Sequence, residues 1–135
     1  EPGSIVRLML CSGKVYYDLV AHRTELGLEK TVAIIRVEQL YPLALDGLGT
    51  LFKRYPKAQD LTWVQEEPRN MGAWTFISPL LRERFGERFG EPRYVGRDMS
   101  ASPATGHSAS HDLERKLLLD DAFDGLVSSP ATNPA

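Results

Sequence analysis

Polar residues that could take part in binding or catalysis are concentrated in four short segments of this sequence. Each segment follows a short apolar run. Together they hold Ser12, Lys14, Gln39, Glu66, Glu67, Asn70, Ser102 and Thr105, with His111 a few residues further on. In an open parallel sheet the carboxyl ends of the strands gather such loops at one edge, where ligands and partners bind. We therefore expect these residues to share one edge of a sheet.

The segment Ser12, Gly13 and Lys14 could bind an anion, because a helix start offers free backbone N–H groups beside a lysine. The spacing of a Walker phosphate loop is absent. A tight strand-to-helix turn, capped by Ser12 or Gly13, is the competing interpretation. Lys14 could equally pair with an acidic loop nearby.

Glu66 and Glu67 are adjacent, and adjacent strand residues point to opposite faces, so they are unsuited to a catalytic pair. We expect one of the carboxylates to accept hydrogen bonds from a neighbouring loop or subunit. The two tryptophans, Trp63 and Trp74, are expected to anchor core or interface packing.

The three histidines do not show metal-ligand spacing with carboxylates or with the cysteine. His111, followed by Glu114, is expected to cap a helix start, with a catalytic role as the alternative. Cys11 ends an apolar run and is read as an inert, buried residue. The residues by themselves predict no catalytic, cofactor-binding or metal site, and they favour a binding or assembly domain.

The composition narrows the class of protein. A net charge of −2 with scattered basic residues argues against nucleic-acid binding. The single cysteine and the lack of a recognisable secretory signal suggest an intracellular, reducing compartment. No apolar stretch approaches the roughly 20 residues of a membrane span, so a soluble protein is expected.

Four apolar runs, at 6–11, 31–37, 61–65 and 93–97, alternate with helix-like segments. The helices are expected at 14–26, 46–55, after Trp74 with a break or late start at Pro79, and at 112–123. This alternation predicts a three-layer α/β/α domain around a mainly parallel sheet of four to five strands. The domain should cover 6–123, with a linker or added remnant at 1–5 and a flexible tail at 124–135.

Four motifs in fixed order carry a family resemblance. They are CSGKVYYDL at 11–19, RVEQLYP at 36–42, WVQEEPRNMGAW at 63–74, and SASPATG at 100–106 with His111. In order and spacing they resemble the C-terminal domain of the decarboxylating component of 2-oxoglutarate dehydrogenase. The resemblance runs from about Val6 to Phe123.

The resemblance implies a fold like the C-terminal domain of transketolase, packed beside thiamin-binding domains in a homodimer. The parent enzyme would decarboxylate 2-oxoglutarate on thiamin diphosphate with Mg²⁺ and pass succinyl to its dihydrolipoyl succinyltransferase partner in the tricarboxylic acid cycle. Because the thiamin-binding motif is absent here, the chain alone is expected to be inactive and architectural. Ser12, Lys14, Glu66, Glu67, Asn70, Trp74, Ser102, Thr105 and His111 would brace loops or line an interface.

Two alternatives remain open at this stage. The parent could be the related 2-oxoadipate enzyme, or the chain could be a stand-alone anion- or CoA-binding module. In some members of the family, acetyl-CoA binds through a glutamine that Gln39 matches, but Asp46 and Gly47 stand where arginines would follow. A negative charge there disfavours a phosphate ligand. A bacterial cytoplasm and a mitochondrial matrix both fit the sequence.

Overall fold

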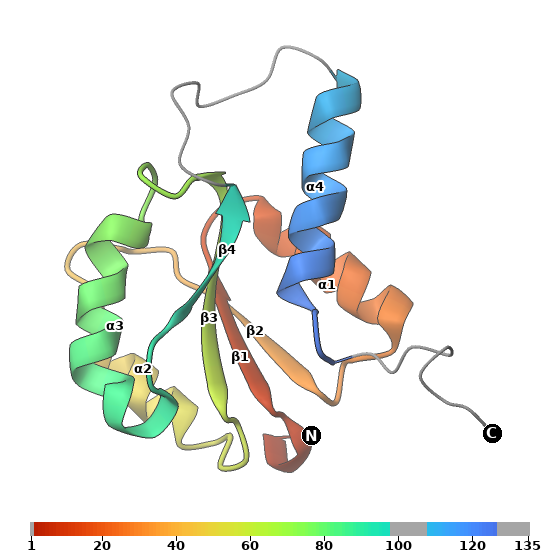
Figure 1. Ribbon diagram of the computed structural model, residues 1–135. Coiled ribbons are helices and arrows are strands. Elements are labelled where there is room, and N and C mark those ends of the chain that lie inside the picture. Colours follow the sequence, from red (N-terminus) through yellow and green to blue (C-terminus); the bar gives the residue numbers. More distant parts are fainter. Residues whose placement is uncertain (1, 98–107, 127–135) are drawn as a thin grey trace.

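The computed structural model describes residues 2–97 and 108–126, and in these ranges it shows a four-stranded sheet between two layers of helices (Figure 1). The strands are β1 (Arg7–Cys11), β2 (Val32–Arg36), β3 (Asp60–Pro68) and β4 (Arg93–Arg97). All neighbouring pairs are parallel, in the order β2-β1-β3-β4. The predicted three-layer α/β fold is confirmed.

The helices cover both faces of the sheet. Helices α1 (Val15–Leu26) and α4 (Ser108–Ala122) lie on one face, and α2 (Leu45–Phe52) and α3 (Trp74–Phe89) lie on the other (Figure 1). No helix in the described ranges is long and apolar enough to cross a membrane.

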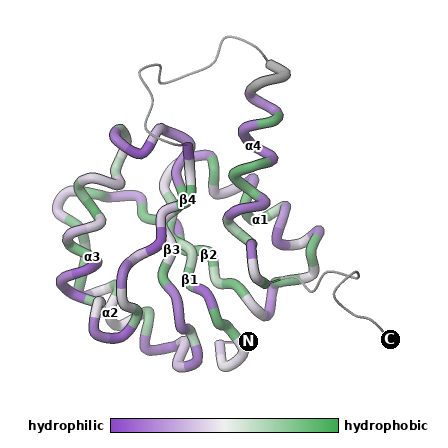
Figure 2. Tube along the Cα trace, in the orientation of Figure 1, coloured by the Kyte–Doolittle hydropathy of each residue, from purple (hydrophilic) through white to green (hydrophobic). Residues whose placement is uncertain are grey.

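Two hydrophobic cores share the sheet, because alternate strand residues point to opposite faces. Leu8, Leu10 and Trp63 pack towards α2 and α3, whereas Met9 and Val64 pack towards α1 and α4. Burial on both faces explains why the central strands are nearly continuously apolar. Figure 2 shows hydrophobic stretches in β1 and β2, whereas β4 and the ends of β3 are largely hydrophilic.

Several predicted boundaries shift in the structure. β3 continues to Pro68, three residues beyond the predicted end, because Pro68 pairs with Arg97 of β4 after an irregularity that begins at Val64. Glu66 and Glu67 are therefore strand residues, not loop residues. Helix α2 stops at Phe52 instead of residue 55, where backbone turns replace it.

The predicted interruption at Pro79 is wrong, since α3 runs unbroken from Trp74 to Phe89. Pro79 lies in the second turn on the exposed side of the helix. Pro79 has no N–H to donate to the carbonyl of Thr75, so the helix lacks one hydrogen bond there. Thr75 is also exposed, and its carbonyl can bind water instead.

The ends of the chain also differ from expectation. Pro2–Ser4 form a short 3-10 turn and Ile5 is buried, so packing begins one residue before the predicted limit. Helix α4 begins at Ser108, four residues early. The predicted start at 112 was based on the apolar residues expected to face the sheet. The helix extends four residues further towards the N-terminus than those apolar residues indicate. Residues 127–135 of the predicted tail lie outside the described ranges.

Candidate functional site

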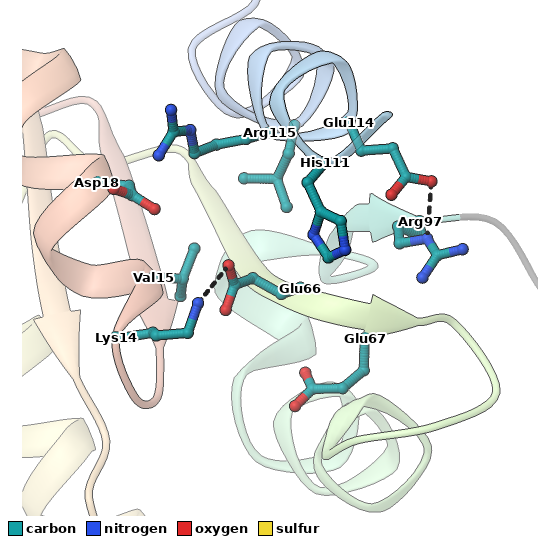
Figure 3. A pocket seen from close by; sticks show the side chains of 10 residues that line it. Lys14, Val15, Asp18, Glu66, Glu67, Arg97, His111, Glu114 and Arg115 are labelled. Atoms are coloured by element: carbon teal, nitrogen blue, oxygen red, sulfur yellow. Dashed lines mark hydrogen bonds and ion pairs between the residues drawn. The ribbon is translucent and has the colours of Figure 1, made fainter. Parts of the chain in front are cut away.

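Two clefts flank the carboxyl edge of the sheet, one on each side of β3. The first, of about 230 Å³, lies between α1 and α4 (Figure 3). The second, of about 530 Å³, lies between the loop after β2 and the start of α3. The first is lined by Lys14, Val15, Asp18, Glu66, Glu67, Arg97, His111, Glu114, Arg115 and Leu118. The predicted concentration of polar residues at one edge is thus present for the part of the chain that the structure describes.

Ion pairs cross the first cleft. Lys14 Nζ lies 3.3 Å from Glu66 Oε2 and links the start of α1 to β3. Arg97 Nε lies 3.2 Å from Glu114 Oε2 and links β4 to α4 (Figure 3). Acidic and basic side chains therefore alternate in this cleft. The positive charges of Lys14 and Arg97, which an anionic ligand would need, are already neutralised by Glu66 and Glu114.

The start of α1 does not have the predicted cap. Lys14 occupies the N-cap position, and no side chain caps the helix there. The chain turns tightly at Gly13, whose φ is 80°, a conformation that glycine adopts without steric cost. The N–H groups of Tyr16 and Tyr17 donate to the carbonyls of Gly13 and Lys14. The geometry favours the strand-to-helix turn over an anion cradle.

Glu66 and Glu67 leave β3 in different directions, as Figure 3 shows. Glu66 faces Lys14 in the first cleft, whereas Glu67 also lines the second cleft. The two carboxylates therefore do not form a general acid–base pair.

Gln65 organises the turn between β3 and α3, a role that the sequence did not predict, although Gln65 stands in the segment expected at the edge of the sheet. Its side chain is buried, with 3% exposure. Its Oε1 accepts hydrogen bonds from Trp63 Nε1 at 2.9 Å and from the backbone N–H of Trp74 at 3.0 Å. Its two Nε2 hydrogens are shared among three carbonyl oxygens, those of Glu67 and Pro68 at the end of β3 and of Met71 in the turn. One amide thus holds both ends of the turn.

No sequence pattern marks Gln65 for burial, because a glutamine before two glutamates has the composition of an exposed strand end. The nearest signal is Trp63, two residues earlier on the same strand face, whose buried indole N–H requires an acceptor.

Two glycines allow this turn to pack closely. A Cβ atom at Gly96 would lie 2.5 Å from Tyr94 Oη and 2.6 Å from the Gln65 carbonyl. A Cβ at Gly72, where φ is +66°, would lie 3.1 Å from Gln65 Oε1. The edge of the sheet therefore depends on two positions without side chains.

The second cleft is bordered by exposed apolar side chains. Tyr41 is 83% exposed and Phe76 40%. The rings of Tyr41 and Phe76 lie 6.1 Å apart, centroid to centroid, in an edge-to-face arrangement. Exposed apolar groups gathered around a hollow are typical of a surface that another molecule covers.

The remaining predicted residues have different surroundings. Ser12 lines the second cleft, and Trp74 is buried in the core. Asn70 is exposed in the turn after β3. Ser102 and Thr105 lie outside the described residues.

His111 lies inside α4, not at its N-cap as predicted, because the helix begins at Ser108. It lines the first cleft. Its expected capping partner, Glu114, pairs with Arg97 instead.

Gln39 and Asp46 bear on the predicted acetyl-CoA site. Gln39 is exposed in the loop after β2, where its Nε2 lies 3.5 Å from the Pro42 carbonyl oxygen. Asp46 forms an ion pair with Arg84 of α3. Arg84 thus places a positive charge beside Asp46, a compensation that the local sequence does not indicate.

Cys11 is fully buried, and this burial raises the pKa of its thiol from 9.0 to about 12. A thiol protonated in this way is a poor nucleophile. Within the ranges that the structure covers, no three potential metal-ligating side chains gather.

Comparison with known proteins gives a consistent result. The profile of the family described as 2-oxoglutarate dehydrogenase C-terminal matches residues 1–123. A 2-oxoglutarate dehydrogenase E1 component of Cupriavidus necator is 45% identical over 88% of this chain and 12% of its own length. A 2-oxoglutarate dehydrogenase E1 component of Rickettsia prowazekii is 44% identical over 91% of this chain and 13% of its own length. A protein of Caenorhabditis elegans named 2-oxoglutarate dehydrogenase, mitochondrial, is 41% identical over 91% and 12%. The chain spans about an eighth of the length of these relatives.

Proposed function

Because this chain belongs to the 2-oxoglutarate dehydrogenase C-terminal family, we propose that it is the architectural domain of a thiamin-dependent 2-oxoglutarate dehydrogenase. In this role the carboxyl edge of its sheet braces the domains that carry out the reaction. The parent enzyme decarboxylates 2-oxoglutarate on thiamin diphosphate, with Mg²⁺, and passes succinyl to a dihydrolipoyl succinyltransferase.

The rigid turn at the end of β3 carries this proposal. The buried side chain of Gln65 forms hydrogen bonds to the backbone of Pro68, Met71 and Trp74, and so fixes both ends of the turn. The side chains of Met71 and Phe76 remain exposed. A preformed surface loses little conformational entropy when a partner covers it. This is the property that a bracing domain needs.

The chemistry of the two clefts fits an architectural role better than a catalytic one. The first cleft is crossed by ion pairs, and Glu66 and Glu67 diverge (Figure 3). Thiamin diphosphate and Mg²⁺ would be held by other domains of the parent enzyme, so this chain contributes position and not reacting groups.

A complementation experiment tests the proposal. We would express this chain and, separately, the preceding part of the open reading frame, and measure CO₂ release from 2-oxoglutarate with thiamin diphosphate and Mg²⁺. The chain alone should be inactive, the preceding part should be impaired, and joining the two should restore turnover.

Two results would contradict the proposal. One is turnover by this chain alone, and the other is full activity of the preceding part without it. Measuring 2-oxoadipate in parallel identifies the substrate of the parent enzyme, because nothing in this domain discriminates the two acids.

A further inference from the structure

The second cleft carries a single formal charge, and that charge is negative. Among the described residues that line it, Glu67 alone is charged at neutral pH. Glu67 is exposed and forms no ion pair with the rest of the described chain. The cations of the first cleft, which Glu67 also borders, pair with other carboxylates. These pairs are Lys14 with Glu66, Arg97 with Glu114, and Arg115 with Asp112. The second cleft therefore attracts a cation.

The carboxylate of Glu67 is held against the wall of this cleft. A Cβ atom at Gly72 would lie 3.1 Å from Glu67 Oε1, so the carboxylate packs directly over that glycine. The backbone of Glu67 is fixed as well, because its carbonyl accepts a hydrogen bond from Gln65 Nε2 at 3.2 Å. A charge that is positioned before its ligand arrives loses little conformational entropy on binding.

Aromatic rings and a hydroxyl group share the cleft with this carboxylate. The exposed rings of Tyr41 and Phe76 lie edge to face, with their centroids 6.1 Å apart, and the face of an aromatic ring attracts a cation. Ser12 lines the same cleft, and its hydroxyl forms no hydrogen bond with another described residue. Together these groups fit a cation that has several N–H donors and an apolar stem.

A guanidinium satisfies these requirements better than an ammonium ion does. It is planar and weakly hydrated, it forms two parallel hydrogen bonds with a carboxylate, and it stacks on aromatic rings. The volume of the cleft, about 530 Å³, lies within the range of about 300 to 1,000 Å³ that is typical of ligand pockets. An arginine side chain therefore has both the chemistry and the size that the cleft accepts.

The chain spans about an eighth of the length of its relatives, so most of such a protein is outside it and can supply that side chain. The exposed rings around the cleft are typical of a surface that another part of a protein covers. On the premise that this domain braces a longer enzyme, as proposed above, we infer that the second cleft receives an arginine side chain from a neighbouring domain. The guanidinium pairs with Glu67, and the stem of the arginine crosses Tyr41 and Phe76.

Titration of the 135-residue chain with N-acetyl-L-arginine amide tests the cation site, because this probe carries a guanidinium and no other charge. NMR spectra should show saturable shifts of the backbone signals of Glu67, Ala73 and Phe76, with a dissociation constant on the order of 1 mM. N-acetyl-L-citrulline amide, which has the same shape without the charge, should bind at least about tenfold more weakly. The corresponding lysine amide should also bind more weakly, since its ammonium is more strongly hydrated.

Substitutions assign the binding to the second cleft. Glu67→Gln keeps the size of the side chain but removes its charge, and it should weaken binding of the arginine probe about tenfold or more. Phe76→Ala should weaken it about two- to fivefold through loss of the ring. Glu83→Gln is the matched control, since Glu83 is an exposed carboxylate of α3 that lines neither cleft, and it should leave binding unchanged. Thermal unfolding confirms that every variant is folded.

The source of the arginine is tested with the joined protein of the complementation experiment. There the cleft should already be occupied, so saturation-transfer NMR should detect no binding of the arginine probe. Equal binding to the joined protein and to the chain alone would contradict the inference, because the cleft would then be an open site for a small guanidinium compound.

Three further results overturn the inference: no saturable binding of the arginine probe to the chain, equal binding of the arginine and citrulline probes, or a Glu67→Gln variant that binds like the wild type. Each of them leaves the complementation experiment unaffected. Restored turnover without probe binding would refute only the arginine site, whereas failure to restore turnover would refute the bracing function itself.

Discussion

Gln65 shows how a single side chain can fix the conformation of a loop. It accepts hydrogen bonds from Trp63 and from the backbone of Trp74, and it donates to carbonyls of the turn between them. Both the amide oxygen and the amide nitrogen are required, because the oxygen faces only donors and the nitrogen only acceptors. No other residue type supplies this combination at the same length.

We expect Gln65→Glu to lower the free energy of unfolding by about 3 kcal/mol, because a carboxylate would face backbone carbonyls in a buried position. Urea denaturation measures the change. Gln59→Glu, at an exposed glutamine just before β3, is the matched control and should alter stability by less than about 0.5 kcal/mol. Equal effects of the two substitutions would show that Gln65 does not organise the turn.

Gly96 is a second position where one residue decides local structure. Gly96→Ala should destabilise the chain by about 2 kcal/mol or more, since the added Cβ would lie 2.6 Å from the backbone carbonyl of Gln65. Gly86→Ala in α3, where nothing lies within 4 Å of the added Cβ, should instead stabilise by about 0.5 to 1 kcal/mol. Melting temperatures of the two variants that shift in the same direction would contradict this contrast.

At the scale of elements, arginines on the sheet attach the last helix. Arg7 of β1 is buried, and its Nη1 donates to the carbonyls of Ala122 at 2.8 Å and Asp124 at 3.0 Å. Arg93 of β4 donates to the carbonyl of Asp121 at 2.8 Å. These cations meet the C-terminal end of α4, where the helix has unsatisfied carbonyls and partial negative charge.

Arg7→Met should therefore loosen α4 before the rest of the fold. Its side chain has a similar length but offers no donor for the carbonyls. We expect a loss of about 2 to 3 kcal/mol and faster hydrogen exchange in residues 111–122, with protection kept in β1 and β3. Arg54→Met, at an exposed arginine after α2, should leave exchange unchanged. Uniform loss of protection throughout the domain would argue against a separate role for Arg7.

At the scale of the whole molecule, the sheet joins the two cores into one unit. Each central strand contributes to both cores, as Leu8 and Met9 do from adjacent positions. Unfolding of one core therefore exposes strand residues of the other, and the chain should unfold in a single transition. Cys11, at the end of β1 beneath α1, is a natural reporter of that transition.

Reagents for thiols should label Cys11 only when the chain unfolds, because burial keeps the pKa of the thiol near 12. Because the thiol has a higher pKa in the folded chain than its ordinary value of 9.0, its contribution to stability is fully present below pH 9.0. That contribution is lost as the pH rises towards 12. Cys11→Ala should consequently lose less stability than the wild type between about pH 8 and about pH 11 in urea titrations. Rapid labelling of the folded chain near neutral pH would refute the burial argument.

The sequence by itself determined the elements and their order. The nearly continuous apolar run at 31–37 predicted a central strand covered on both faces, and this was wrong, since β2 lies at the edge of the sheet and its last residues are partly exposed. The alternation of apolar runs with helix-like segments implied parallel connections, which the structure confirms. The predicted helix at 14–26 matches α1 closely, and Gly27 follows its last residue with φ at 70°. Such features are readable because they depend on residues close together in the chain.

Only the tertiary structure decided which polar groups meet. Arg7 and Ala122 are 115 positions apart, and the interaction between Lys14 and Glu66 spans 52. A hydrogen bond depends on distance in space, and periodicity records only which face of an element is buried. For the same reason the burial of Gln65 and the continuation of β3 through Glu67 became visible only once the elements were packed.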